Sequence, residues 1–150
     1  MLDRLTPVLG LYIHWPFCAA KCPYCDFNSH VSARVDYARW ESAMRSEIRR
    51  LAFETEGRLL RTVFFGGGTP SLMPPKLVEA LLEEVKANWA WANDIEITLE
   101  ANPTSVEADR FEDLRRAGIN RVSLGVQALN DADLQKLGRM HNAEEALQAL

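Results

Sequence analysis

Four short apolar runs, each followed by a longer amphipathic stretch, constrain the fold of this chain more than any other feature. The runs cover residues 9–15, 59–65, 95–100 and 121–127. After the first run, Trp40, Met44 and Ile48 recur at a spacing of four, which indicates a helix with one apolar face. Strands that alternate with helices are parallel, and their crossovers are right-handed. The sequence therefore predicts an α/β fold of four consecutive parallel βα units, either an open doubly wound sheet or part of a barrel.

Cap residues indicate where the helices begin and end. Ser32 or Asp36 suits the start of the first helix, and proline in a first turn places the second helix near residues 74–75. Gly118 suits the end of a third helix that includes Val106. A last helical stretch begins near Asp131 or Asp133 and is still amphipathic at Leu150. Because this pattern is unfinished, we expect residues 1–150 to be the first part of a larger domain.

The composition limits the functions that this chain can have. Its 150 residues are 47% hydrophobic and 25% charged, which is typical of one globular domain. The net charge is −4 and there is no basic run, so we expect no nucleic-acid binding. No apolar stretch approaches the roughly 20 residues of a membrane span, and the N-terminus lacks the apolar core of a signal peptide. These features predict a cytoplasmic protein.

The three cysteines, Cys18, Cys22 and Cys25, fall within eight residues. An odd number of thiols in a chain without a secretory signal is more typical of metal binding than of disulfides. Three thiolates in a C-x3-C-x2-C pattern can hold three corners of a cubane iron–sulfur cluster and leave its fourth iron open. The loop also follows the first strand, where α/β folds place their active sites. A Cys3His zinc site that uses His14 or His30 is the alternative.

A run of three glycines, residues 66–68, ends the second strand and continues into Thr69 and Pro70. No Lys-Ser/Thr pair follows, so this is not a phosphate-binding P-loop. Glycine at a strand end lets a ligand approach the backbone and leaves amide and carbonyl groups available for hydrogen bonds. Beside the cysteine loop, this run favours a binding role over a simple flexible turn.

Polar side chains also stand at the ends of the later strands. Glu100 ends the third strand and Gln127 ends the fourth, and a carboxylate such as Glu100 suits a ribose diol. Arg139 can bind a carboxylate or phosphate through its two-pronged guanidinium group. Tyr12 and His14 alternate with apolar residues, so both are expected on the same side of the first strand.

These residues resemble the radical S-adenosylmethionine (SAM) superfamily. The resemblance implies the first part of a partial TIM barrel and a [4Fe–4S] cluster on Cys18, Cys22 and Cys25. It also implies that the amino and carboxylate groups of SAM chelate the open iron, and that reduction cleaves SAM to methionine and a 5′-deoxyadenosyl radical. Residues 1–150 then form the N-terminal part of a radical SAM core domain.

Four motifs resemble one family more closely, the oxygen-independent coproporphyrinogen III oxidases. They are YIHWPFC at 12–18, GGGTPS at 66–71, EANP at 100–103 and GVQ at 125–127. Carried over position by position, the resemblance assigns these residues to cofactor binding: Tyr12, Tyr24, Gly67, Gly68, Thr69, Glu100, Gln127 and Arg139.

Two branches of this family compete. The decarboxylating oxidases carry one more cysteine, C-x3-C-x2-C-x-C, and a longer segment before it, whereas here Asp26 and Phe27 follow Cys25 and 17 residues precede Cys18. Both differences favour the HemW-like heme-chaperone branch. That branch implies heme or porphyrin binding through residues beyond 150 and delivery of heme to respiratory proteins. It also implies an electron donor such as a flavodoxin or reductase system, and it is compatible with a homodimer. Coproporphyrinogen oxidation and a structural zinc-binding interaction domain are the alternatives.

Overall fold

The computed structural model describes residues 8–104 and 110–150. Its elements are β1 (Val8–Trp15), β2 (Phe17–Cys18), β3 (His30–Val31), α1 (Tyr37–Glu54), β4 (Leu59–Gly67), the 3₁₀ turn η1 (Pro70–Leu72), α2 (Pro75–Asn88), β5 (Ala90–Ala101), α4 (Phe111–Arg116), β6 (Arg121–Leu124), α5 (Asp131–Lys136) and α6 (Ala143–Gln148). Within this part, β1, β4, β5 and β6 form one parallel sheet in that order. The predicted succession of parallel βα units is confirmed. No helix in the described ranges is long and apolar enough to cross a membrane.

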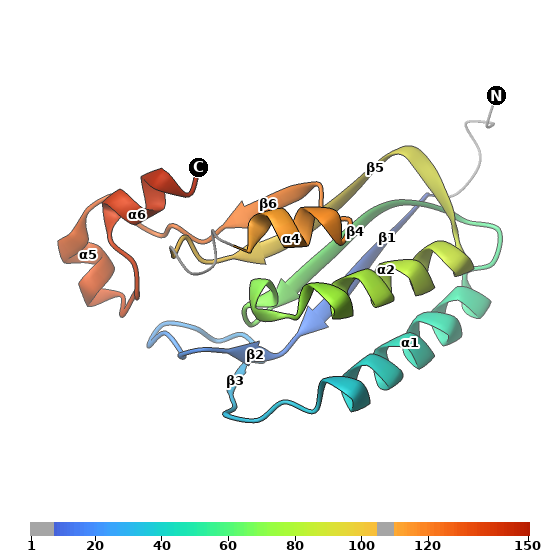
Figure 1. Ribbon diagram of the computed structural model, residues 1–150, viewed down its shortest axis with the longest axis horizontal. Helices are drawn as coiled ribbons and strands as arrows, with labels where there is room; N and C mark the ends of the chain where they lie inside the picture. Colours follow the sequence, from blue (N-terminus) through green and yellow to red (C-terminus); the bar gives the residue numbers. More distant parts are fainter. Residues whose placement is uncertain (1–7, 105–109) are drawn as a thin grey trace.

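The strand order separates the two architectures that the sequence left open. Each new strand joins the same side of the sheet, so the order never reverses as it does in a doubly wound sheet. Right-handed crossovers then place α1, α2 and α4 over one face, as Figure 1 shows. The described strands therefore form an arc of a barrel.

Alternation along β1 assigns its two faces. Leu11, Ile13 and Trp15 are buried in the core under the helices. Tyr12 and His14 lie on the opposite face, where the Tyr12 hydroxyl and His14 Nδ1 are 3.0 Å apart. The expected placement of both residues on one side of the strand is confirmed.

An ion network joins α1 to α2. The nearly buried carboxylate of Glu84 accepts hydrogen bonds from Arg45 Nε at 2.9 Å and Arg49 Nε at 2.7 Å. Asn88 Nδ2 also donates to Glu84, at 3.0 Å. Chiefly through Arg49, and against the cost of burial, these bonds lower the pKa of Glu84 to about 2.

Several predicted boundaries hold. Asp36, one of two predicted caps, accepts a hydrogen bond from Arg39 N at 3.0 Å at the start of α1. Gly118 lies two residues after the end of α4 with a φ of +115°, which glycine adopts without a Cβ clash. Val106, predicted in the same helix, lies outside the described residues.

Other boundaries differ. β5 begins at Ala90 rather than at residue 95, because a register shift between Leu60 and Thr62 lets it pair with the start of β4. β6 ends at Leu124 rather than at residue 127. The single helical stretch predicted near the end of the chain is wrong: Gly138, with a φ of +67°, lies in the segment that separates α5 from α6.

Candidate metal centre

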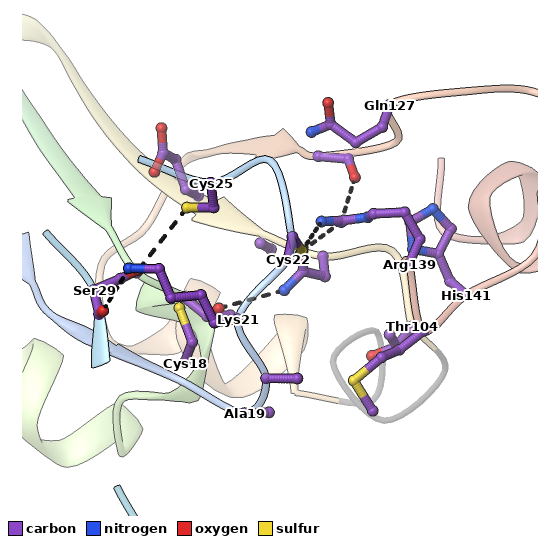
Figure 2. Close-up of a pocket in the computed structure, with 18 of the residues that line it drawn as sticks. Cys18, Ala19, Lys21, Cys22, Cys25, Ser29, Thr104, Gln127, Arg139 and His141 are labelled. Atoms are coloured by element: carbon purple, nitrogen blue, oxygen red, sulfur yellow. Dashed lines mark hydrogen bonds between the residues drawn. The ribbon is translucent and has the colours of Figure 1, made fainter. Parts of the chain in front are cut away.

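A cavity of about 720 Å³ lies at the carboxyl ends of the sheet strands. Its walls come from the loop at 18–29, the ends of β4, β5 and β6, and the segment between α5 and α6. All the predicted site residues except Tyr12 line this cavity. Figure 2 shows the three cysteines between Ser29 on one side and Arg139 with His141 on the other.

The cysteine loop has its own framework. Its base is closed by a short parallel pair, β2 with β3, and by a hydrogen bond from His30 N to Pro16 O at 2.7 Å. Lys21 Nζ crosses the loop and donates to the carbonyl oxygens of Phe27 at 3.3 Å and Ser29 at 3.1 Å. All three thiols are free and partly exposed. The loop thus holds them at the cavity without a disulfide.

The donor side chains can be compared with the needs of a cluster and of a single zinc ion. Across residues 8–104 and 110–150, no three His, Cys, Asp or Glu side chains form a group that could hold one metal ion. His14 bonds through both nitrogens, to the Tyr12 hydroxyl at 3.0 Å and to Asn28 O at 2.9 Å, and His30 Nε2 lies 3.0 Å from Asn28 Oδ1. A cubane binds each cysteine through a different iron, so its thiols need not converge on one point. The three thiols are thus compatible with a cubane, and both histidines of the zinc alternative already have hydrogen-bond partners.

The packing around the glycine run requires glycine even without a bound ligand. Gly67 has a φ of +113°, and a Cβ there would lie 2.6 Å from His14 Cε1. A Cβ on Gly68 would lie 2.6 Å from the carbonyl oxygen of Phe17. The close approach of β4 to the preceding strands thus accounts for both glycines.

The backbone amides of this segment already donate hydrogen bonds to other groups of the protein. Gly67 N donates to Glu100 Oε2 at 3.2 Å, Gly68 N to Trp15 O at 2.6 Å and Thr69 N to Phe17 O at 2.8 Å. The expectation that the glycine run leaves its amide groups available is therefore wrong at these three positions. What Gly67 contributes is a fixed orientation of the Glu100 carboxylate.

The ends of β5 and β6 bring further polar groups to the cavity. Glu100 lies on its wall, and Gln127 follows β6 with a φ of +68°, a conformation that non-glycine residues rarely adopt. Tyr12 lies outside the wall but close by. Burial, and then the negative charge of Glu100, raise the pKa of the Tyr12 hydroxyl.

Arg139 connects the cavity walls. Its Nη2 donates to Asn102 Oδ1 at 2.6 Å and Gly125 O at 2.7 Å, and its Nη1 donates to Cys22 Sγ at 3.4 Å and the Tyr24 hydroxyl at 3.3 Å. These bonds occupy the terminal N–H groups that were expected to bind a carboxylate or phosphate. The assignment of Arg139 to cofactor binding stays a prediction, and the structure adds a second role as a clasp between the cysteine loop and the strand ends.

Sequence reasoning missed two buried polar residues in this cavity. His141 is 5% exposed, with Nε2 3.1 Å from Val126 O and a buried Nδ1 that has no hydrogen-bond partner among the described residues. Ser29 is 2% exposed, and its Oγ lies 3.9 Å from Cys25 Sγ. Gly138 and the Asn142–Glu145 capping box indicate the turn that carries His141, but no local pattern distinguishes Ser29.

Comparisons with known proteins agree with this geometry. The profile of the radical SAM superfamily matches residues 12–150, and the chain belongs to that superfamily. The chain is 46% identical to "Heme chaperone HemW" of Escherichia coli over 95% of its own length and 38% of that protein. It is also 46% identical to "Radical S-adenosyl methionine domain-containing protein 1, mitochondrial" of Bos taurus, over 94% of this chain and 32% of that one.

Among solved structures, coproporphyrinogen III oxidase (HemN) from Escherichia coli, described as a radical SAM enzyme, superimposes with a TM-score of 0.82. The two are 30% identical over 96% of this chain and 34% of that chain. Within the superfamily, the chain therefore belongs to the HemN/HemW-like family. It spans less than half the length of these relatives. Membership of the superfamily implies a [4Fe–4S] cluster and SAM.

Proposed function

We propose that Cys18, Cys22 and Cys25 hold a [4Fe–4S] cluster with one open iron, and that SAM binds beside it in the cavity. The observation that carries the proposal is the shared cavity: the three thiols and the polar ends of β4, β5 and β6 line one space. Its volume of about 720 Å³ is in the range of small-molecule sites, about 300–1,000 Å³. Cluster and SAM together supply an electron and a carbon-centred radical when bound.

The chain's own residues orient the ligand. Glu100 can accept two hydroxyl hydrogen bonds from a ribose, and Gly67 N fixes the direction of its carboxylate. Gln127 offers its side-chain amide from the segment after β6, and Tyr24 offers its hydroxyl from the cysteine loop. Burial raises the pKa of the Tyr24 hydroxyl, although the charge of Arg139 opposes this.

For the whole protein, we propose a cytoplasmic protein that binds heme and delivers it to respiratory acceptor proteins, with residues 1–150 as the N-terminal part of the radical SAM core. The relative named a heme chaperone is 46% identical, whereas the coproporphyrinogen oxidase is 30% identical. Asp26 and Phe27 follow Cys25, without the additional cysteine of the oxidases. Oxidation of coproporphyrinogen III is the second candidate, favoured by the similarity of fold.

Anaerobic reconstitution with iron and sulfide tests the cluster. We expect iron and sulfide in equal amounts and an electron paramagnetic resonance (EPR) spectrum of the reduced cluster that changes on addition of SAM. Replacing each cysteine by alanine should abolish the spectrum, whereas Ser32→Ala, a neighbouring exposed position, should leave it unchanged. Zinc without iron or sulfide in oxygen-free preparations would overturn the proposal.

Two further assays separate the functions of the whole protein. Incubation with heme and an apo-acceptor should transfer heme. Incubation with coproporphyrinogen III, SAM and a reductant should form no vinyl product. Formation of that product would favour the oxidase instead.

A further inference from the structure

Two of the three cysteine sulfurs have a hydrogen-bonding neighbour outside the cysteine motif. Arg139 Nη1 donates to Cys22 Sγ at 3.4 Å, and Ser29 Oγ lies 3.9 Å from Cys25 Sγ. Within the part of the chain that the structure describes, Cys18 Sγ has no such side-chain bond. The sulfur environment of the site is therefore asymmetric.

The direction of the Ser29 bond follows from the surrounding donors. Ser29 is 2% exposed, so its hydroxyl proton needs an acceptor within the protein. Phe27 O lies 3.4 Å away, but it already accepts from Ser29 N at 2.7 Å and Lys21 Nζ at 3.3 Å. A cysteine that binds iron has lost its proton and can only accept. The Ser29 hydroxyl can therefore turn from Phe27 O to Cys25 Sγ without leaving that carbonyl unpaired.

Two further hydrogen bonds hold the guanidinium group of Arg139 in the position from which it donates to Cys22. Its Nη2 is fixed by Asn102 Oδ1 at 2.6 Å and Gly125 O at 2.7 Å, at the ends of β5 and β6. Its Nε is buried without a hydrogen-bond partner among the described residues, so the two Nη2 bonds are what orient the guanidinium group. Arg139 thus directs both an N–H group and a positive charge at the Cys22 sulfur.

We propose that Ser29 and Arg139 raise the reduction potential of the bound cluster by donating hydrogen bonds to the sulfurs of Cys25 and Cys22. This inference rests on the proposed function. Reduction adds negative charge to the cluster and its sulfur ligands, so a donor to these atoms stabilises the reduced form more than the oxidised form. Both residues are positioning residues that act through the cysteines.

The test is a redox titration of the reconstituted protein without SAM, followed by EPR, after iron and sulfide have been measured. We expect Ser29→Ala and Arg139→Gln each to shift the midpoint to a more negative potential. Ser29→Thr, which keeps the hydroxyl, should restore it, and Arg139→Lys, which keeps the charge alone, should lie between wild type and Arg139→Gln. Ser32→Ala is the matched control, because the Ser32 hydroxyl bonds Arg34 O at 2.7 Å.

Unchanged midpoints in Ser29→Ala and Arg139→Gln, with full iron and sulfide, would overturn this inference and leave the proposed function standing. Wild-type protein without iron and sulfide would overturn both. A second measurement needs no variant: pulsed EPR of the reduced wild-type cluster in D₂O should show exchangeable deuterons coupled to it. Their absence would refute the hydrogen bonds even if a variant failed to assemble.

Discussion

Gly67 offers the sharpest test of how the end of β4 is built. Its φ of +113° lies in the region that favours glycine, and a Cβ there would stand 2.6 Å from His14 Cε1 and 2.9 Å from Trp15 O. Gly67→Ala therefore adds backbone strain and a steric clash at the same position. Gly57→Ala is the matched control, because Gly57 has a φ of +77° and nothing within 4 Å of its Cβ direction.

The two penalties can be estimated separately. Alanine in a left-handed conformation costs about 1–2 kcal/mol, which applies to both variants. Inserting a methyl group into a filled space adds about 1–3 kcal/mol, which applies to Gly67→Ala alone. We therefore expect a loss of about 1–2 kcal/mol for Gly57→Ala and about 2–5 kcal/mol for Gly67→Ala.

Urea denaturation followed by tryptophan fluorescence measures both losses, and Trp15, next to the clash, is nearly fully buried. His14→Ala combined with Gly67→Ala removes the ring but leaves the Trp15 carbonyl in place. The double variant should therefore be more stable than the sum of the single losses predicts. Equal losses in Gly57→Ala and Gly67→Ala, or strict additivity in the double variant, would refute the steric argument.

Three further predictions concern stability. Because the pKa of Glu84 is about 2 in the folded protein, against an ordinary value of 4.5, its contribution is complete above pH 4.5 and is lost as the pH falls towards 2. Glu84→Gln should cost about 1–3 kcal/mol at pH 7 and flatten the pH dependence in acid denaturation, since Arg49 loses its carboxylate partner and Arg45 keeps only Glu41; an unchanged acid midpoint would contradict this. Asn142→Ala removes the capping box of α6 and should cost about 1 kcal/mol, seen as faster amide exchange there but not in α1. Asn120→Ala leaves Ile97 N and Ile95 O without their side-chain partner and should cost about 1–3 kcal/mol, whereas no change in urea midpoint would show that water replaces it.

Local sequence patterns predicted the scaffold well because they report directly on burial. The alternation at Leu11, Tyr12 and Ile13 assigned both faces of β1, and the polar residues at 32 and 36 placed the start of α1. The order of the strands was beyond such patterns. Whether a sheet reverses depends on contacts between units far apart in the chain, and only the arrangement of β1, β4, β5 and β6 separates the barrel arc from the doubly wound sheet.

Local sequence patterns also predicted only part of the candidate site. Spacing predicted the three thiols, and motif resemblance predicted seven further residues of the cavity wall. Neither revealed that the amides of Gly67, Gly68 and Thr69 are already bonded within the protein, because those bonds depend on how closely β4 approaches β1 and β2. The roles of Ser29 and Arg139 as partners of cysteine sulfurs were also missed. Ser29 is four residues from Cys25, but in a loop without periodic structure, and Arg139 is 117 residues from Cys22.

The bond between Cys22 and Arg139 joins residues 117 positions apart. A ribosome makes the cysteine loop long before it makes Arg139, and bringing such distant segments together is among the slower steps of folding. During translation the loop therefore exists for a period without its clasp, and the mature surroundings of the Cys22 sulfur form only after residue 139 has emerged. A cluster inserted before that point would bind Cys22 without the Arg139 hydrogen bond.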